Sequence, residues 1–172
     1  MKKIFRKRRT VVVIALAVLL LVSYLVYSRP MTLSQLFPLR DIDQCIGISG
    51  YYSASTQTDG ITQFAIEPGS EEFQELCRLF NEKTYRRSLR GLLSRGVRTQ
   101  PITDKFEFEW EVMFHFDTIA FPDGNAGSGP LLRVQYWYGE LDIENVVWKS
   151  VRRSYHTREQ DAWAREILDC MR

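Results

Sequence analysis

The chain has 172 residues, and its 23 basic and 21 acidic side chains give a formal net charge of +2. This length suits one domain of ordinary size. A content of 45% hydrophobic and 26% charged residues excludes a wholly disordered or collagen-like chain, and the near-neutral charge argues against nucleic-acid binding.

A basic segment and an apolar run open the sequence. Residues 1–9 contain six cationic side chains and no acidic one, and residues 10–27 carry no charge. A helix of this apolar length, rising ~1.5 Å per residue, is about 27 Å long, close to the thickness of a bilayer's hydrocarbon core. We therefore predict a single-pass membrane anchor at residues 10–28. Because basic residues favour the cytoplasmic side, residues 1–9 are expected in the cytoplasm and the rest of the chain outside it.

A cleaved signal peptide is the alternative interpretation of this segment, and a buried core helix is a weaker one. Cleavage requires small residues after the apolar core, whereas Tyr24, Leu25 and Tyr27 at the exit are bulky. With an uncleaved anchor, 16 basic residues and all 21 acidic residues follow position 29, so residues 30–172 carry a net charge of −5.

The first half of the external part predicts two strands and a helix. Residues 29–40 are expected to be a juxtamembrane linker, and the folded domain is expected at residues 41–172. Apolar alternation predicts strands at 42–49 and 61–67, joined as a hairpin through a polar turn at 50–60. Ser70 suits the N-cap of a following helix. The buried stripe of that helix comprises Phe73, Leu76, Cys77, Leu79 and Phe80.

The second half begins with the clearest strand signal in the chain. Residues 105–117 alternate six times between apolar and polar positions. Residues 131–138 are apolar or aromatic on both faces, which predicts a central return strand. A turn at 139–145 is expected to lead to a last strand at 146–155.

A second helix of the domain is expected to close the chain. Thr157 and Gln160 have the spacing of a capping box, and the buried side of the helix comprises Trp163, Ile167, Cys170 and Met171. The predicted fold class is α+β: a transmembrane helix, then a ββαβββα domain with a mainly antiparallel sheet and two helices packed on one face.

A ladder of carboxylates on the strand at 105–117 is the most conspicuous polar feature. Glu107, Glu109 and Glu111 share one face of that strand, and Arg133 and Trp137 share a face of the return strand. These five residues form the candidate binding surface, where the indole can stack on a sugar or a peptide. The alternative is a solvated sheet face on which the carboxylates pair with cations of neighbouring strands.

Residues 83–98 contain six cations and no acid. One interpretation is contact with anionic lipid headgroups or wall polymers at the membrane, at on the order of 1 kcal/mol per cation. The residues for that contact are Arg86, Arg87, Arg90 and Arg95. The other interpretation, which we favour from the sequence, is an exposed segment whose cations offset the acidic surplus of the domain.

The residues available for catalysis or cofactor binding are few. The sequence has no nucleophile elbow, Walker loop or Gly-rich dinucleotide turn, and no cysteine or histidine spacing typical of zinc, so no cofactor or metal is expected. His115, or Cys45 paired with a histidine, is the remaining basis for an enzyme. Cys77 and Cys170 lie on apolar stripes of helices, which predicts small buried side chains, with a bridge between the two as the alternative.

Several short motifs together resemble a known group of proteins. They are the run Leu33-Ser34-Gln35-Leu36-Phe37-Pro38, the Asp41-Ile42 pair, the helix at 73–80 and the triplet Tyr85-Arg86-Arg87. The combination is similar to that of small single-pass membrane proteins of Gram-positive bacteria with an extracytoplasmic α+β domain. The resemblance extends over residues 1–118. It implies a location and an architecture, and it supplies no catalytic residues.

These observations lead to one expected function and two alternatives. We expect a membrane-anchored extracytoplasmic binding or sensing domain without catalysis, which meets a protein or cell-envelope partner and no nucleic acid. The first alternative is an anchored hydrolase or redox enzyme that uses His115 or a cysteine. The second is an accessory subunit of a membrane assembly, with the anchor helix as an interface.

Overall fold

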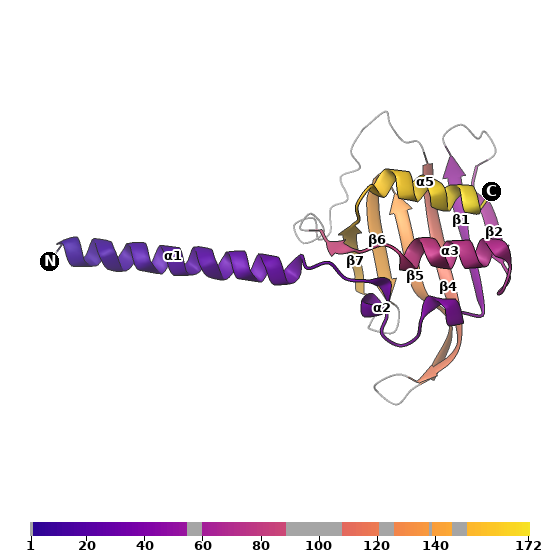
Figure 1. Cartoon of the computed structure of the whole chain (residues 1–172), viewed down its shortest axis with the longest axis horizontal. Coiled ribbons are helices and arrows are strands. Elements are labelled where there is room, and N and C mark those ends of the chain that lie inside the picture. The colour runs from indigo at the N-terminus through magenta and orange to yellow at the C-terminus, as the bar shows by residue number, and fades with distance from the viewer. Residues whose placement is uncertain (1, 55–59, 89–107, 121–125, 138, 146–150) are drawn as a thin grey trace.

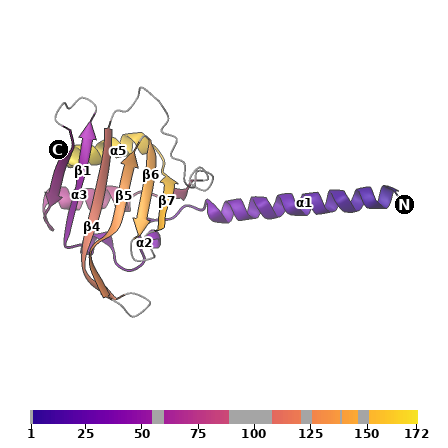
Figure 2. The same ribbon diagram turned by 180° about the vertical axis from the view of Figure 1, so that it is seen from behind.

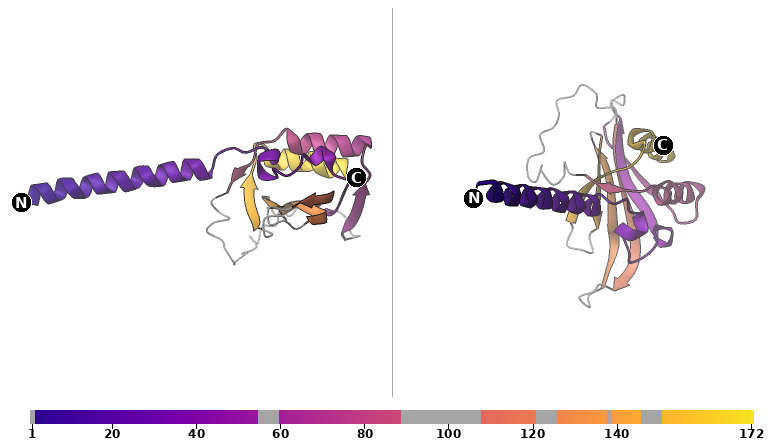
Figure 3. Two further views of the ribbon diagram at one scale, coloured as in Figure 1. Left: turned by 90° about the horizontal axis from the view of Figure 1, so that it is seen from below. Right: turned by 60° about the vertical axis from the view of Figure 1, so that its left-hand side comes forward.

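The computed structural model of the chain describes residues 2–54, 60–88, 108–120, 126–137, 139–145 and 151–172. A long helix, α1 (Lys2–Tyr27), leads into a two-layer domain. There α3 (Glu71–Asn81) and α5 (Gln160–Cys170) lie on one face of an antiparallel sheet (Figures 1 and 3). The α+β class and the position of both helices on one face are confirmed.

The sheet has seven strands in the order β2-β1-β4-β5-β6-β7-β3, and each strand is antiparallel to its neighbours. Figure 2 shows it from the side away from the helices. The strands are β1 (Gly47–Ala54), β2 (Thr62–Ile66), β3 (Arg86–Arg87), β4 (Phe108–Ala120), β5 (Ala126–Trp137), β6 (Glu140–Asn145) and β7 (Val151–His156). The predicted ββαβββα order is therefore wrong, because β3 and β6 are additional strands. The central position of β5 is confirmed.

Strand β4 has the alternation that its sequence predicts. Its side chains toward the helices are buried, and four of them are completely inaccessible: Trp110, Val112, Phe114 and Phe116. Burying a large apolar side chain stabilises a fold by ~1.5–3 kcal/mol. This one strand therefore supplies a large share of the hydrophobic free energy of the domain.

An aromatic cluster joins the helical layer to the sheet. The ring of Phe80 on α3 meets Trp110, Phe114 and Trp163 edge-on, with centroid distances of 6.1, 5.3 and 5.4 Å. The indole N–H of Trp110 donates to the Ala164 carbonyl at 2.9 Å, and that of Trp163 donates to the Leu79 carbonyl at 3.0 Å. Both buried donors are thus satisfied, as buried indoles require.

The helix α3 begins and packs as predicted. The Ser70 hydroxyl accepts a hydrogen bond from the Phe73 N–H at 3.1 Å, which satisfies one of the free donors of the first turn. The five residues of the predicted stripe are all buried. The start of α5 differs from the prediction. The Gln160 side chain accepts a hydrogen bond from the Thr157 N–H, as in a capping box. The Thr157 hydroxyl, however, donates to the Thr84 carbonyl instead of capping the helix. The helix therefore starts later, after Glu159, whose φ is 53°.

The first strand lies later in the chain than predicted. Ile42–Gln44 form a 3-10 helix, η1, and the strand runs from Gly47 through the predicted turn to Ala54. It pairs on both sides, with β2 and with β4, so its backbone hydrogen bonds outweigh the turn-like composition of the segment. The second strand of the hairpin is confirmed at Thr62–Ile66.

A strand also replaces the turn predicted at 139–145. Within β6, Leu141 and Ile143 face the core with 0% and 4% exposure, and only Gly139, at φ 72°, has a turn conformation that favours glycine. The last strand begins at Val151. The preceding part of that predicted strand, 146–150, lies outside the described residues.

The predicted linker at 29–40 is mostly part of the domain. Met31, Leu33 and Phe37 are 4%, 1% and 1% exposed and belong to the core, around the short helix α2 (Leu33–Leu36). Met31 also forms an isolated antiparallel bridge with Tyr85, with N···O distances of 2.9 and 2.7 Å. The packed structure therefore starts at Met31, directly after the exit of α1.

A single glycine in β1 tests this sheet register. A Cβ at Gly50 would overlap the Glu111 carbonyl oxygen on β4, whereas a Cβ at Gly47 would lie 3.8 Å from the Ile66 carbonyl oxygen, an ordinary contact. Because overpacking costs ~1–3 kcal/mol, we expect Gly50→Ala to lower the melting temperature by roughly 5–10 °C. Gly47→Ala is the matched control, with little change expected. Thermal unfolding followed by circular dichroism measures both, and equal responses would contradict the register.

Candidate functional site

We call the sheet face opposite to α3 and α5 the outer face, and Figure 2 views the sheet from that side. A row of polar residues crosses this face. The register of six neighbouring strands places the members of this outer row side by side: Gln63, Tyr51, Glu111, Gln135, Asp142 and Ser154. The strands that carry the row are held rigidly by the aromatic core behind them. The outer row is therefore a preorganised polar surface.

Glu111 lies at the centre of the row. It is 9% exposed, and among the described residues it is the only charged one that is buried. Arg133 Nε lies 3.4 Å from one carboxylate oxygen, and the Tyr51 hydroxyl donates to the other at 3.5 Å. Both contacts are longer than the ~2.7–2.9 Å of a good charge-assisted hydrogen bond. The carboxylate consequently retains capacity for a closer cationic donor.

Two more contacts extend this network along the outer face. Gln135 Nε2 donates to the Tyr51 hydroxyl oxygen at 3.2 Å, and an Arg133 terminal nitrogen donates to Glu144 at 3.3 Å. Burial, together with the nearby Glu111 charge, raises the pKa of Tyr51. The phenol therefore stays protonated and acts as a donor at neutral pH. The network connects β1, β4, β5 and β6.

The outer face is acidic. Its charged side chains on β4, β5 and β6 include five carboxylates and one guanidinium: Glu109, Glu111, Glu140, Asp142, Glu144 and Arg133. Ser154 donates to Asp142 at 2.7 Å, which fixes one of these carboxylates. Burial raises the pKa of Glu109 above its usual value, because a half-buried carboxylate without a close cation disfavours its charged form. A surface with this balance attracts cations.

A serine and a histidine are paired near the other end of the same face. Ser49 Oγ and His115 Nε2 lie 2.6 Å apart, on β1 and β4. Burial lowers the pKa of His115, so the imidazole is neutral at neutral pH. Among the described residues, this hydrogen bond joins a serine to a histidine, a potential nucleophile to a potential base.

The predicted binding residues are partly brought together. Glu109, Glu111, Arg133 and Trp137 share the outer face, and Arg133 meets Glu111 directly. Glu107 lies outside the described residues. The sequence pattern does not predict Tyr51, the outer-row residue of β1, because the composition of segment 50–60 is typical of a turn. The pair of tyrosines at 51 and 52, which favours strands, was the available signal.

The predicted cationic surface lies elsewhere. Arg86 and Arg87 form the short edge strand β3, beside the exit of α1 (Figure 1). The guanidinium carbon of Arg87 lies 5.6 Å from the centroid of the Tyr27 ring, at the last residue of α1. Arg90 and Arg95 lie outside the described residues.

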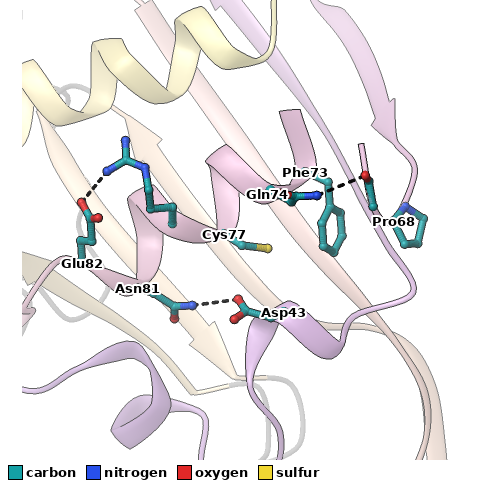
Figure 4. A pocket seen from close by; sticks show the side chains of 9 residues that line it. Asp43, Pro68, Phe73, Gln74, Cys77, Asn81 and Glu82 are labelled. Atoms are coloured by element: carbon teal, nitrogen blue, oxygen red, sulfur yellow. Dashed lines mark hydrogen bonds and ion pairs between the residues drawn. The ribbon is translucent and has the colours of Figure 1, made fainter. Parts of the chain in front are cut away.

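A cleft of about 570 Å³ opens beside α3 (Figure 4). It is lined by Asp43, Pro68, Gly69, Phe73, Gln74, Cys77, Arg78, Asn81 and Glu82. Two hydrogen bonds hold its rim: Asn81 Nδ2 donates to Asp43 at 2.8 Å, and Gln74 Nε2 donates to the Gly69 carbonyl at 3.3 Å. The sequence analysis did not predict this cleft, because its two sides are far apart in the chain.

Comparisons of the chain with protein-family models, with curated proteins and with solved structures give no match. In the described part of the chain, no group of three or more histidine, cysteine or acidic side chains is arranged to hold a metal ion. The function is therefore argued from the outer face, the helix α1 and the edge strand beside it.

The His115 site predicts a specific pH dependence of stability. The pKa of His115 is lower in the folded chain than in the unfolded one, so unfolding takes up a proton. Its contribution to stability is therefore complete above the unfolded pKa, ~6.5, and is lost as the pH falls through the folded pKa. We expect the melting temperature to fall more between about pH 7.5 and about pH 5.5 in the wild type than in His115→Gln. Identical pH slopes of the two proteins would contradict this effect.

Proposed function

We propose that this chain is a single-pass membrane protein that holds a non-catalytic binding or sensing domain outside the cytoplasm. This is also the location and architecture of the Gram-positive proteins that its motifs resemble. The observation that carries the proposal is the ordered outer row on an acidic outer face, which the fold presents opposite to its helices.

The helix α1 supports the membrane part of this proposal. Its Thr10–Tyr27 stretch is long and apolar enough to cross a bilayer, and none of it is buried against the rest of the chain. A soluble core helix would bury such a stretch, since an exposed apolar surface of this size is unfavourable in water. The cations in the preceding residues favour a cytoplasmic N-terminus.

The chemistry of the outer face favours a partner with cationic groups, such as a basic protein segment or an amine-bearing wall polymer. Glu111 is buried and is held only by long contacts, so a bound ammonium or guanidinium group would gain a short charge-assisted hydrogen bond there. The neighbouring carboxylates on β4 and β6 would steer such a partner toward the face. Trp137 and Tyr51 provide apolar contact area beside the charges.

Two interpretations exist for the cationic residues at 83–98: contact with anionic lipid headgroups, or cations that only offset the acidic surplus of the domain. For Arg86 and Arg87, the position of β3 favours contact with lipid. Arg86 is exposed and Arg87 packs on Tyr27, where the apolar helix ends. Tyrosine and arginine at that position suit the headgroup region of an anionic leaflet. We propose that this contact orients the domain on the membrane.

Orientation is tested with reporter fusions to the full chain. An enzyme that is active only outside the cytoplasm should give activity when fused after Arg172 and none when fused before Met1. Replacing the six cations of residues 1–9 with glutamine should lower the C-terminal signal, because the topology then loses its positive-inside determinant. Activity of the N-terminal fusion alone would contradict the proposed orientation.

Partner binding is tested by photo-crosslinking in native membranes. A photoreactive residue at Gln63, on the outer face, should capture a partner, whereas the same residue at Glu72, exposed on α3, should not. Reversing the charge with Glu109→Lys or Glu144→Lys should lower the capture by roughly tenfold each, about 1.4 kcal/mol. The matched control is Glu72→Lys. Equal capture from both positions, or no loss on charge reversal, would contradict an acidic binding face.

Hydrolysis is the second candidate, and the Ser49–His115 contact at 2.6 Å is the observation that favours it. A neutral histidine bonded to a serine is the start of a nucleophilic site. The described residues, however, place no carboxylate in hydrogen-bond contact with the imidazole. His115→Gln separates the two functions. A hydrolase would lose labelling of Ser49 by a fluorophosphonate, whereas a binding domain would keep its crosslinked partner.

A further inference from the structure

Two cysteines that are far apart in the sequence meet in the core. Cys45 lies between η1 and β1, and Cys77 lies on the inward side of α3. Each is 4% exposed, and both are free thiols. The third cysteine, Cys170, is half-buried near the end of α5.

A shared carbonyl group brings the first two cysteines together. The Ile42 oxygen accepts the Cys45 N–H at 3.0 Å, and Cys77 Sγ donates to the same oxygen at 3.9 Å. Figure 4 shows Cys77 projecting from α3 toward the segment that follows Asp43. One turn further along α3, the Asn81–Asp43 hydrogen bond holds that segment against the helix.

We propose that Cys45 and Cys77 form a redox-active dithiol that a disulfide-bonded donor oxidises to an intramolecular disulfide, while Cys170 remains a thiol. The role in the cell rests on the external location proposed above, because disulfides persist in oxidising compartments. In the exchange, the two S–H bonds and the donor's S–S bond break, and the Cys45–Cys77 S–S bond forms. The two protons and two electrons pass to the donor, which leaves as two thiols.

The surroundings of the pair suit thiol–disulfide exchange. Hydrogen bonds from the Cys77 thiol and from the Gly47 N–H lower the pKa of Cys45, despite its burial. The interaction with Cys45, and after it burial, raises the pKa of Cys77. A thiolate therefore forms more easily on Cys45 than on Cys77. Cys170 has no such partner among the described residues, and burial raises its pKa.

The cleft beside α3 is the route by which a donor reaches the pair. Cys77 lines it, next to Phe73 and Gln74 (Figure 4). Oxidation would cross-link the segment between η1 and β1 to α3 and would close a loop that contains the whole β1–β2 hairpin. A cross-link of this kind restricts the unfolded chain and stabilises the fold.

The test uses the full chain in detergent micelles. The protein is reduced and freed of reductant, then incubated with oxidised glutathione and unfolded in the presence of a thiol-reactive polyethylene glycol. The wild type should change from three reactive thiols to one, and Cys170→Ser, the matched control, should change from two to none. Peptide mapping should find the bridge between the peptides that contain Cys45 and Cys77. A bridge to Cys170, or three thiols that persist, would overturn the proposal.

A second measurement does not depend on any variant that fails to fold. The wild-type melting temperature should be higher after oxidation than after reduction, by roughly 5 °C or more for a loop of this size, and the difference should persist in Cys170→Ser. Equal melting temperatures of the oxidised and reduced forms would overturn the proposal.

Alkylation in living cells separates this inference from the proposed location. If the pair oxidises in micelles and is also trapped as a disulfide in cells, the dithiol and the external placement are both supported. If it oxidises in micelles but is fully reduced in cells, the dithiol stands and its cellular oxidation is overturned. The reporter fusions described above then decide the location independently.

Discussion

Two buried indole hydrogen bonds hold this domain together, and the other features depend on them. Trp110 of β4 donates to the backbone of α5, and Trp163 of α5 donates to the backbone of α3. An unsatisfied buried N–H is costly, so each donor fixes the position of one helix against its neighbour. Phe80 fills the space between the two indoles. This arrangement sets where α3 presents Cys77 and fixes the strand β4, whose other side carries the centre of the outer row.

The elements that the sequence predicts well are those in which one local signal is strong. The alternation along β4 extends over many residues, and the Ser70 cap coincides with a clear apolar stripe on α3. The wrong predictions fall where contacts between distant parts of the chain determine the local secondary structure. The apolar pattern after Asp41 becomes a 3-10 turn, and β6 is only six residues long and directly follows the turn-forming Gly139. Met31, Leu33 and Phe37 lie in a segment too short for a clear period, yet all three are buried in the core.

The candidate sites follow the same rule. Alternation on β4 and β5 predicts that Glu109, Glu111, Arg133 and Trp137 share a face, because side-chain direction in a strand is a local property. Their partners are not local. Tyr51 reaches Glu111 only because β1 pairs with β4, and Cys45 reaches Cys77 only because η1 packs on α3. No spacing in the sequence carries that information, since it depends on strand order and on the packing of helices.

The bridge between Met31 and Tyr85 has a mechanical consequence. Only three residues, at positions 28–30, separate the last turn of α1 from this pairing, and such a segment spans at most about 10 Å. This short connection therefore restricts how far the domain can move relative to α1. Because the connection between α1 and the domain is this short, a tilt of α1 is passed on to the sheet. A load applied to the outer face would likewise be transmitted through Tyr85 and Met31 into α1.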